Sequence, residues 1–352
     1  QIHMKRAIIY GVTGQDGSYL SEFLLNKGYK VYGVTRRSSI DNTARLHISL
    51  TNKRFELVQG DVTDLPSIYR LLNNVQPHEV YNLAAQSHVG TSFEQPTNTW
   101  NVVAQGCMNI LETIRSMSKR PRFYQASSSE MFGDSFECDD SDCLEAYQDE
   151  YTVFNPQSPY AVAKLAAHQA TTLYRNSYDI FACSGILFNH ESERRGENFV
   201  TRKVTKYIAK LHQALDEGGD IPILSLGNLN VERDWGYAPE YVEAMWLMLQ
   251  QENPDDFVIS TGETWTIEDF VIEAFRCINI YEYKDYVKID EKLRRPSEVY
   301  YLRGKSDKAK ELLGWSPNVS FEQLVKIMVD HDIQGGYGYV EDQLSYGEVW
   351  NK

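Results

Sequence analysis

The sequence predicts an α/β fold built on a doubly wound parallel sheet, with a smaller α/β lobe in its C-terminal part. Short β-branched runs alternate with helical stretches through the first half of the chain, which is the rhythm of right-handed strand–helix–strand units. A glycine-rich turn follows the first of these runs and opens a helix. The 352 residues also exceed one typical core, so we expect two lobes, the first of them Rossmann-like.

The first lobe is predicted from the order of its strands and helices. Each strand rests on a run of β-branched or aromatic residues, as in Arg6-Ala-Ile-Ile-Tyr10. Helical patterns occupy residues 18–26 and 97–118, and another helix opens at Ser158-Pro159, where serine suits the N-cap and proline the first turn. The predicted strands are residues 6–10, 30–35, 55–58, 79–83, 123–127 and 180–187.

Beyond residue 190 the alternation becomes looser and predicts the smaller lobe. Helices are expected at residues 198–215, 239–250 and 267–277, with short strands at 221–225 and 257–259. We expect a first domain over residues 4–190 and a second over 191–340, with some chain crossing between them. Residues 335–338, Gly-Gly-Tyr-Gly, are expected to begin a loose tail.

The charge balance limits the expected partners. Forty-nine acidic residues outnumber 35 basic ones, which gives a net charge of −14 and a pI of about 5.1. Proteins that bind nucleic acid or anionic membranes need net basic surfaces, so we expect neither partner. No apolar run approaches the ~20 residues that span a bilayer, so we expect no transmembrane helix. Residues 134–150 carry eight acidic side chains and no lysine or arginine, which predicts a solvated surface loop.

The five cysteines predict neither a disulfide framework nor a zinc site. Their number is odd, their spacing is irregular and no Cys-x-x-Cys occurs. Cys138 and Cys143 lie in the acidic loop, but no nearby histidine completes a ligand set, so we expect no metal. Residues 1–4 contain no apolar region typical of a signal peptide, and we expect a protein of the reducing cytoplasm.

The turn after the first strand predicts a phosphate site. Glycines allow a tight turn and close backbone approach to a pyrophosphate, and the helix N-terminus supplies N–H donors and the positive end of its dipole. The spacing is G-x-x-G-x-x-G rather than the commoner G-x-G-x-x-G, so a purely structural turn is the alternative. Its place after the first strand favours a dinucleotide site made by Gly11, Gly14, Gln15, Asp16 and Gly17.

The ends of the next strands indicate which dinucleotide binds. An NAD site usually places an acid after the second strand for the ribose 2′-hydroxyl, whereas this chain has Arg36 and Arg37. A guanidinium can hold a 2′-phosphate, which favours NADP, and a pair of surface arginines is the alternative. Asp61, after the third strand, is expected to contact the adenine. Ala84 and Ala85 follow the fourth strand, where the cofactor must approach the backbone closely.

Tyr160 and Lys164 are the candidate catalytic pair. They are four residues apart on one face of a predicted helix, and we expect the ammonium to lower the pKa of the phenol toward that of a useful base. A second Tyr-x-x-x-Lys, at residues 301–305, is taken as chance because no strand-end hydroxyls precede it. Ahead of Tyr160, the run Ala126-Ser-Ser-Ser-Glu130 ends the fifth strand, where ligands bind in such sheets. A hydroxyl facing a Tyr/Lys pair is the arrangement for hydride transfer from an alcohol carbon to a nicotinamide.

These residues resemble the extended short-chain dehydrogenase/reductase family in its nucleotide-sugar branch, and in particular the GDP-mannose 4,6-dehydratases. The match runs from Met4 to about Asp332, and long segments such as 186–192 are much more specific than the glycine turn. The resemblance implies conversion of GDP-mannose to GDP-4-keto-6-deoxymannose and water, with the C4 hydride held by NADP and returned to C6. The matching segments are 11–20, 36–39, 76–83, 123–127, 158–165, 185–192, 195–203, 233–236 and 295–298.

The implied reaction needs an acid/base group near C5 and C6, and Glu130 supplies it. One carboxylate can remove the C5 proton, which the 4-ketone acidifies, and then protonate the departing C6 hydroxyl. A solvated loop carboxylate is the alternative. The family usually has threonine where this chain has Ser128, so the hydroxyl is kept, and a role shared with Ser127 or Ser129 stays open. With the Tyr/Lys pair, Ser128 and Glu130 complete the implied catalytic set.

The resemblance also assigns the binding residues. For each cation alone, an ordinary surface charge is the alternative. The family's segment at residues 36–45 tends to reach a neighbouring subunit, which implies a homotetramer, with a dimer as the alternative. The cofactor set comprises the turn residues, Arg36, Asp61, Val62, Leu83, Ala84, Ala85, Ser87, Tyr160, Lys164, His190 and Arg195, and the nucleotide-sugar set comprises Ser87, Glu130, Asn189, Lys203, Arg233, Arg295 and Glu298.

Three alternatives remain open at this point. A related nucleotide-sugar dehydratase, epimerase or reductase would use the same fold, although Glu130 argues against simple epimerisation. Side reduction of the 4-keto product by NADPH is also compatible with these residues. A non-catalytic NADP-binding scaffold is the candidate from another class, and the intact Ser/Glu/Tyr/Lys set argues against it.

Overall fold

The computed structural model describes residues 3–335, and its centre is a seven-stranded sheet in which all neighbouring strands are parallel. The order β11-β6-β5-β4-β1-β2-β3 reverses direction between β1 and β4, and such a switch point is where ligands bind in open α/β sheets. The strands are β1 (Arg6–Tyr10), β2 (Lys30–Thr35), β3 (Phe55–Gln59), β4 (Glu79–Asn82), β5 (Arg122–Ser128), β6 (Ala182–Leu187) and β11 (Asp256–Ile259).

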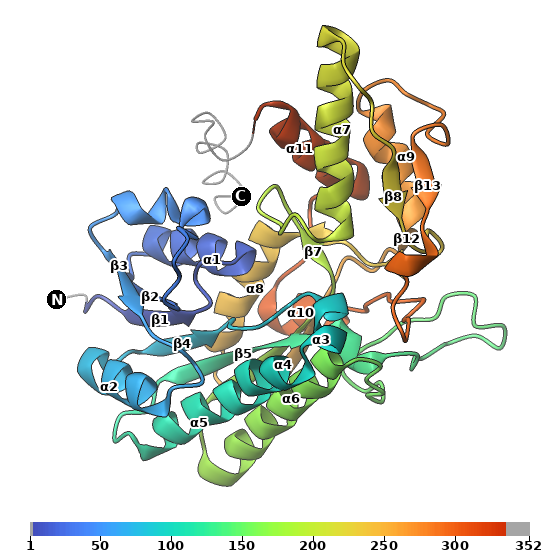
Figure 1. Ribbon diagram of the computed structural model, residues 1–352. Helices are drawn as coiled ribbons and strands as arrows, with labels where there is room; N and C mark the ends of the chain where they lie inside the picture. The colour runs from blue at the N-terminus through green and yellow to red at the C-terminus, as the bar shows by residue number, and fades with distance from the viewer. Residues whose placement is uncertain (1–2, 336–352) are drawn as a thin grey trace.

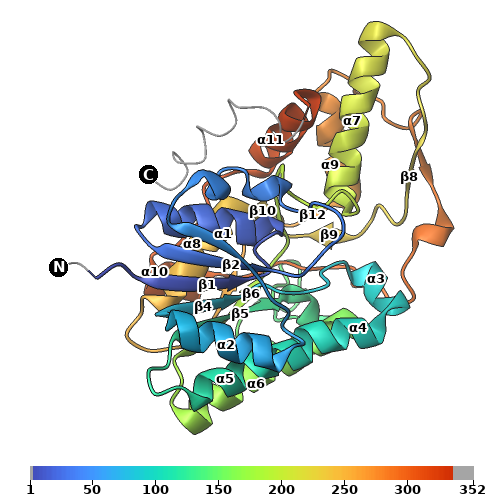
Figure 2. The same cartoon turned by 60° about the vertical axis from the view of Figure 1, so that its left-hand side comes forward.

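Helices cover both faces of this sheet (Figure 1). One face carries α2 (Leu65–Val75), α5 (Gly106–Ser116) and α6 (Pro159–Tyr178), whose apolar side chains pack with the sheet in one core cluster. The other face carries α1 (Gln15–Asn26), α8 (Ala238–Leu249) and α10 (Asp307–Leu313), which contribute to a second cluster. Figure 2 shows the two helical layers on opposite sides of the strands.

A third core lies outside the sheet, in the region around α7 (Val200–Glu217), α9 (Ile267–Arg276) and α11 (Phe321–Ile333). These helices gather with β8 (Leu224–Leu226) and β13 (Val287–Ile289), as Figure 1 shows. Two short strand pairs connect this region to the sheet. They are β7 (His190–Glu191) with β10 (Gly236–Tyr237), and β9 (Glu232–Arg233) with β12 (Trp265–Thr266); α3 (Val89–Glu94) and α4 (Pro96–Trp100) follow β4.

The predicted strands of the first half are confirmed, β1 and β2 with identical ends. The strand expected at 257–259 was wrongly placed in the smaller lobe, because β11 pairs with β6 at the edge of the main sheet. The single helix expected at 97–118 is α4, a π-helical turn at Asn101–Gln105 and α5. The division at residue 190 stays a prediction, and residues 336–340 lie outside the described part of the chain.

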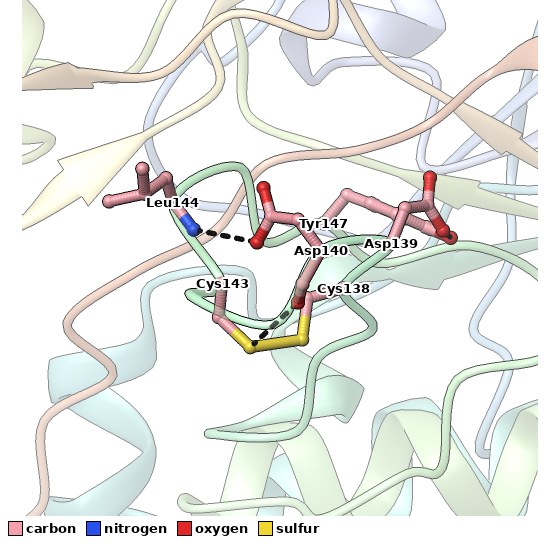
Figure 3. Close-up of a disulfide and its surroundings, with 6 residues drawn as sticks. All are labelled: Cys138, Asp139, Asp140, Cys143, Leu144 and Tyr147. Atoms are coloured by element: carbon pink, nitrogen blue, oxygen red, sulfur yellow. Dashed lines mark hydrogen bonds between the residues drawn. A yellow bond between two sulfur atoms is a disulfide. The ribbon is translucent and has the colours of Figure 1, made fainter.

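The acidic loop differs from its prediction in one respect. Cys138 and Cys143 are joined by a disulfide, whereas the irregular cysteine spacing predicted none (Figure 3). The two residues are five apart in sequence, and the turn is also closed by a hydrogen bond from the Leu144 N–H to the Asp140 carboxylate. A short-range bond of this kind depends on loop geometry that spacing alone does not reveal.

Two other sequence features can be compared with the described residues. Among the helices of residues 3–335, none has the length and apolar character needed to cross a membrane. No group of three or more histidine, cysteine or acidic side chains in the same range is arranged to hold a metal ion.

Candidate active site

The glycine turn lies at the switch point of the sheet and brings the end of β1 against the end of β4. Gly11 has a φ of +78°, and a Cβ there would lie 2.7 Å from the Leu83 carbonyl oxygen, so only glycine fits. Gly14 is the N-cap of α1 and provides no side-chain acceptor for the first-turn N–H groups. The helix therefore begins with N–H groups available to an anion, in the place predicted from the sequence.

The other predicted cofactor residues follow neighbouring strands along the same edge. Arg36 is exposed after β2, and no ion pair involves it within the described residues. The Asp61 carboxylate after β3 accepts hydrogen bonds from the N–H and hydroxyl of Thr63, at 2.9 and 2.8 Å. Val62 is buried, Ser87 is exposed, and Leu83, Ala84 and Ala85 are only partly buried after β4.

Arg45, which the resemblance placed in a segment that reaches a neighbouring subunit, contacts its own chain. Its guanidinium donates to the carbonyl oxygens of Thr13 and Arg194, at 3.2 and 2.8 Å. The side chain therefore links the glycine turn to the segment after β7.

Tyr160 is the second residue of α6, and the helix begins as the sequence predicts. The Ala161 N–H donates to Ser158 Oγ at 3.0 Å, which caps the helix, and Pro159 occupies the first turn. Tyr160 is 8% exposed and forms a hydrogen bond with Ser128 at the end of β5. The structure thus brings the phenol and the strand-end hydroxyl together.

The predicted lowering of the Tyr160 pKa by Lys164 is wrong. Burial raises the pKa of Tyr160 to about 12, although the hydrogen bond from Ser128 and the charge of Arg195 both oppose this rise. The Lys164 ammonium instead donates to the Ala126 carbonyl oxygen at 2.8 Å, and it lies 5.7 Å from the centre of the Tyr160 ring. Burial also lowers the pKa of Lys164 to about 8.

Glu130 lies in a short 3₁₀ turn directly after β5. Its backbone N–H donates to Ser128 Oγ at 3.2 Å, and the following Met131 and Phe132 are fully buried, so its backbone is held on both sides. Only 8% of Glu130 is exposed. Its Oε1 lies 3.8 Å from Arg233 Nη2, and its charge raises the pKa of Tyr160. The carboxylate therefore faces both the phenol and a buried cation.

Arg233 lies close to several of the other predicted substrate-binding residues. Burial, together with the charge of Arg295, lowers its pKa, while Glu130 and Glu298 act in the opposite direction. The structure thus brings Arg233, Arg295, Glu298 and Glu130 near one another. Lys203 is occupied elsewhere, because its Nζ donates to the Ser225 carbonyl oxygen at 2.8 Å.

Residues just after β6 connect the sheet to the glycine turn. His190 Nε2 donates to the Asp16 carboxylate at 2.5 Å, and Gln15 donates to the His190 carbonyl oxygen at 3.0 Å. Burial acts to lower the pKa of His190, but the charge and the hydrogen bond of Asp16, together with the hydrogen bond to the Phe188 backbone, outweigh burial and raise it. Arg195 pairs with Glu191 at 2.9 Å, and the Asn189 carbonyl accepts from the Gly236 N–H. Asp16, His190 and Arg195 therefore form one charged group beside the turn.

Two residues near the site were missed from the sequence. Asp234 is fully buried, and its carboxylate accepts hydrogen bonds from the N–H and hydroxyl of Thr261 and from the N–H groups of Gly262 and Gly304. Asp234 directly follows Arg233 in segment 233–236, which carries the family resemblance, and that place in the sequence is the signal that could have identified it. His88 caps α3. Burial is the main cause that lowers the pKa of the His88 imidazole, and the charge of Arg295 lowers it further.

The second Tyr-x-x-x-Lys pair lies against the acidic loop. Tyr301 donates to the Ala146 carbonyl at 2.6 Å, and Lys305 lies 3.6 Å from the Asp139 carboxylate. These contacts involve loop residues and leave the pair without a strand-end hydroxyl of the kind that faces Tyr160.

Comparison with known proteins decides the family. A family model described as GDP-mannose 4,6 dehydratase matches residues 8–328. GDP-mannose 4,6 dehydratase 2 of Arabidopsis thaliana is 51% identical over 340 residues, covering 94% of this chain and 87% of the relative. The chain belongs to the GDP-mannose 4,6-dehydratase family. Another family member, from Homo sapiens, is 43% identical, with 93% of this chain and 91% of the relative covered.

Solved structures of other proteins share the fold of this chain. UDP-glucose 4-epimerase of Thermus thermophilus, solved with NAD, has a TM-score of 0.78 at 22% identity, covering 94% of this chain and 99% of that one. dTDP-glucose 4,6-dehydratase of Bacillus anthracis, also solved with NAD, has a TM-score of 0.76 at 17% identity, with coverages of 93% and 96%. These likenesses confirm the predicted Rossmann-like fold.

Proposed function

We propose that this protein is a hydro-lyase that converts GDP-mannose to GDP-4-keto-6-deoxymannose and water. Family membership supports the substrate and the product. The observation that carries the chemistry is the position of Glu130, buried between the Ser128–Tyr160 pair and Arg233. A simple C4 oxidation needs no such carboxylate, whereas removal of water across C5 and C6 needs an acid/base group there.

The first chemical step uses Tyr160 as the base for the C4 hydroxyl. A phenol is already neutral at neutral pH, and burial raises the pKa of Tyr160 further, to about 12, so it needs help to lose its proton. The Ser128 hydrogen bond and the charge of Arg195 both favour the phenolate. Ser128 then donates to the C4 oxygen beside the phenol, which fixes the sugar's orientation.

Elimination and the final proton transfers use Glu130. The carboxylate takes the C5 proton and gives a proton to the C6 hydroxyl as it leaves, so one group acts first as base and then as acid. Arg233 Nη2 lies 3.8 Å from Glu130 Oε1, so a buried cation stands beside the carboxylate that carries out these transfers. Arg233 and Arg295 provide cations for the diphosphate, which a guanidinium can bind through two N–H groups.

The cofactor that we propose is NADP. The residues present fit a dinucleotide, because Gly11 leaves no room for a Cβ at the switch point and α1 begins with uncapped N–H groups. A bound nicotinamide would accept the C4 hydride and return it to C6 while C5 takes up a proton, which replaces the one lost in the elimination and balances the C4 hydroxyl proton released through Tyr160, so that the overall reaction is redox-neutral. RMD of Pseudomonas aeruginosa, which has a TM-score of 0.73 to this chain at 19% identity and covers 94% of it and 99% of its own length, was solved with NADPH. The exposed Arg36 supports the phosphorylated form.

Product analysis tests the proposed reaction. The protein is incubated with NADP and, separately, with GDP-mannose, GDP-glucose, TDP-glucose and UDP-glucose, and each mixture is analysed by mass spectrometry. We expect loss of one water from GDP-mannose and no comparable loss from the other three. Dehydration of TDP- or UDP-glucose without dehydration of GDP-mannose would overturn the proposal.

A charge reversal tests the choice of NADP. Arg36→Glu is expected to weaken NADPH binding roughly 10- to 100-fold, which corresponds to the loss of a charge-assisted hydrogen bond, while NADH binding changes little. Fluorescence titration of the reduced cofactors measures both affinities, and Arg276→Glu, at an exposed position on α9, is the matched control. An equal loss for both cofactors would contradict a 2′-phosphate contact.

We also propose, from the family resemblance, that the protein assembles as a homotetramer or a dimer. From its cysteine usage we propose that it acts in the cytoplasm, since the short-range Cys138–Cys143 bond leaves Cys107, Cys183 and Cys277 free. Light scattering coupled to size-exclusion chromatography measures the mass directly. A monomer across the micromolar range would contradict the proposed assembly.

A further inference from the structure

A second hydrogen-bonded side-chain pair joins β5 to α6 next to the catalytic residues. Ser127 Oγ lies 2.8 Å from His168 Nδ1, and the two residues are 5% and 4% exposed. Neither side chain has a part in the chemistry described above. The sequence leaves open a role for Ser127 shared with Ser128, and the contact of Ser127 with His168 shows where its hydroxyl is engaged instead.

His168 is itself held from several sides. Its Nε2 faces the Asp256 carboxylate of β11 at 3.8 Å, and Asp256 is fixed by Arg175 at 2.5 Å and by the Ser184 N–H at 3.1 Å. The ring also packs edge-on against Phe154, with ring centres 5.1 Å apart. The imidazole therefore has a defined position and orientation.

The surroundings also determine which ring nitrogen carries the proton. Burial lowers the pKa of His168, so the ring is neutral at neutral pH. A neutral ring with a carboxylate in front of Nε2 keeps its hydrogen on Nε2, which leaves Nδ1 as the acceptor. Ser127 is therefore the donor in this pair, and its hydrogen is directed away from Ser128.

The pair belongs to a set of three contacts between the same two elements. Tyr160, Lys164 and His168 are four residues apart on one face of α6. They contact Ser128, the Ala126 carbonyl oxygen and Ser127, three consecutive residues at the end of β5. A shift of the helix along the strand would disturb all three contacts together.

We propose that His168 and Ser127 are positioning residues, which fix α6 against β5 and so hold Tyr160 and Lys164 in the geometry needed for the C4 oxidation. The inference rests on the proposed dehydratase function. It predicts a change in the rate of the chemical steps rather than in substrate binding, because Arg233 and Arg295 lie on other elements. A contact that only stabilised the fold would not have that selectivity.

Substitutions at both ends of the hydrogen bond test the proposal. His168→Phe keeps the ring and removes the acceptor, and Ser127→Ala removes the donor with little change of volume. Since a displacement of about 1 Å in an active site can cost roughly 100-fold in rate, we expect kcat to fall about 10- to 100-fold in each variant, with KM for GDP-mannose within about threefold. His168→Asn, whose Oδ1 can occupy the position of Nδ1, is expected to recover most of kcat.

Two further measurements separate positioning from a loss of folded protein. The double variant is expected to be no slower than the slower single variant, because both changes break one interaction. Thermal unfolding is followed for every variant, and His212→Phe, an exposed position on α7, is the matched control. Ser127→Ala removes little volume and keeps the test valid where His168→Phe does not fold.

Several outcomes would overturn the inference. One is wild-type kcat in folded His168→Phe and Ser127→Ala, and another is a double variant in which the two losses multiply. A raised KM with unchanged kcat would assign the pair to substrate binding instead. Failure of the wild-type protein to dehydrate GDP-mannose would defeat the proposed function itself, and that result is obtained before any variant is made.

Discussion

Replacing Glu130 with glutamine removes a charge and a base while keeping the side chain's volume and one acceptor oxygen. At 3.8 Å and an effective dielectric constant of ~20, the attraction between Glu130 and Arg233 is about 4 kcal/mol, which is offset by the cost of burying both charges. Because the two charges are 3.8 Å apart and glutamine keeps a carbonyl oxygen of the same size facing Arg233, we expect the free energy of unfolding to fall by only about 1–3 kcal/mol. The variant should therefore fold and bind both ligands.

The effect of Glu130→Gln on catalysis is expected to be much larger. Loss of a positioned acid/base group lowers rates by about 10²- to 10⁴-fold, which corresponds to about 3–5 kcal/mol in the barrier. Since Tyr160 and Ser128 are unchanged, oxidation at C4 should still take place. The reaction should then stop before water is lost, with reduced cofactor and the 4-keto-6-hydroxy sugar held on the protein.

A pre-steady-state experiment measures both halves of this prediction. Stopped-flow absorbance of reduced nicotinamide should show accumulation in Glu130→Gln and only a small transient in the wild-type protein, while mass spectrometry follows the loss of water. In D₂O, exchange at C5 should disappear in the variant. Glu145→Gln, at an exposed position in the acidic loop, is the control and should behave as wild type. Full dehydration by a folded Glu130→Gln variant would refute this assignment.

The remaining predictions concern Tyr160, Asp234 and the Asp16–His190 pair. Tyr160→Phe should lower kcat by about 10²- to 10⁴-fold, and the reduced nicotinamide seen with Glu130→Gln should not form. Asp234→Asn should lower the free energy of unfolding by about 2–6 kcal/mol in urea titrations, because its single acceptor oxygen leaves two of four buried donors unpaired. The pKa of His190 is raised and that of Asp16 is lowered, so their pairing stabilises the fold fully between the ordinary values of 3.8 and 6.5. Asp16→Asn should therefore lower Tm most in that range, and the difference should shrink as pH rises through the raised pKa of His190 or falls through the lowered pKa of Asp16.

Elements defined by local patterns were predictable from the sequence. β1 and β2 are continuous apolar runs bounded by turn residues, and α6 begins with a serine cap and a proline, so their positions follow from neighbouring residues alone. The glycine turn could likewise be placed, since a Cβ at Gly11 would clash with the Leu83 backbone just after β4 and a Cβ at Gly17 would clash with the backbone of Gly11 and Val12. The strand β11 was assigned to the wrong sheet because a four-residue run does not indicate its partner.

Properties that depend on burial or on contacts between distant segments could not be predicted from local sequence patterns. The spacing of Tyr160 and Lys164 correctly predicted that both lie on one helix. The pKa of the phenol, however, depends on its burial and on the direction of the Lys164 ammonium, which donates to the Ala126 carbonyl oxygen. The disulfide in the acidic loop likewise depends on loop geometry. His168 looked like an ordinary helix residue, since the chain separates it from Ser127 by 41 positions.

The central claim is that one hydride leaves C4 and returns to C6 of the same sugar while Glu130 moves the proton at C5. GDP-mannose carrying deuterium at C4 tests it most directly, with the product's label located by NMR in ordinary water and in the presence of excess unlabelled NADPH. The account predicts that the deuterium is found at C6 and that one water is lost, and that a parallel reaction of unlabelled GDP-mannose in D₂O places deuterium at C5. Loss of the deuterium to free cofactor or to water, with unlabelled C6, would contradict it.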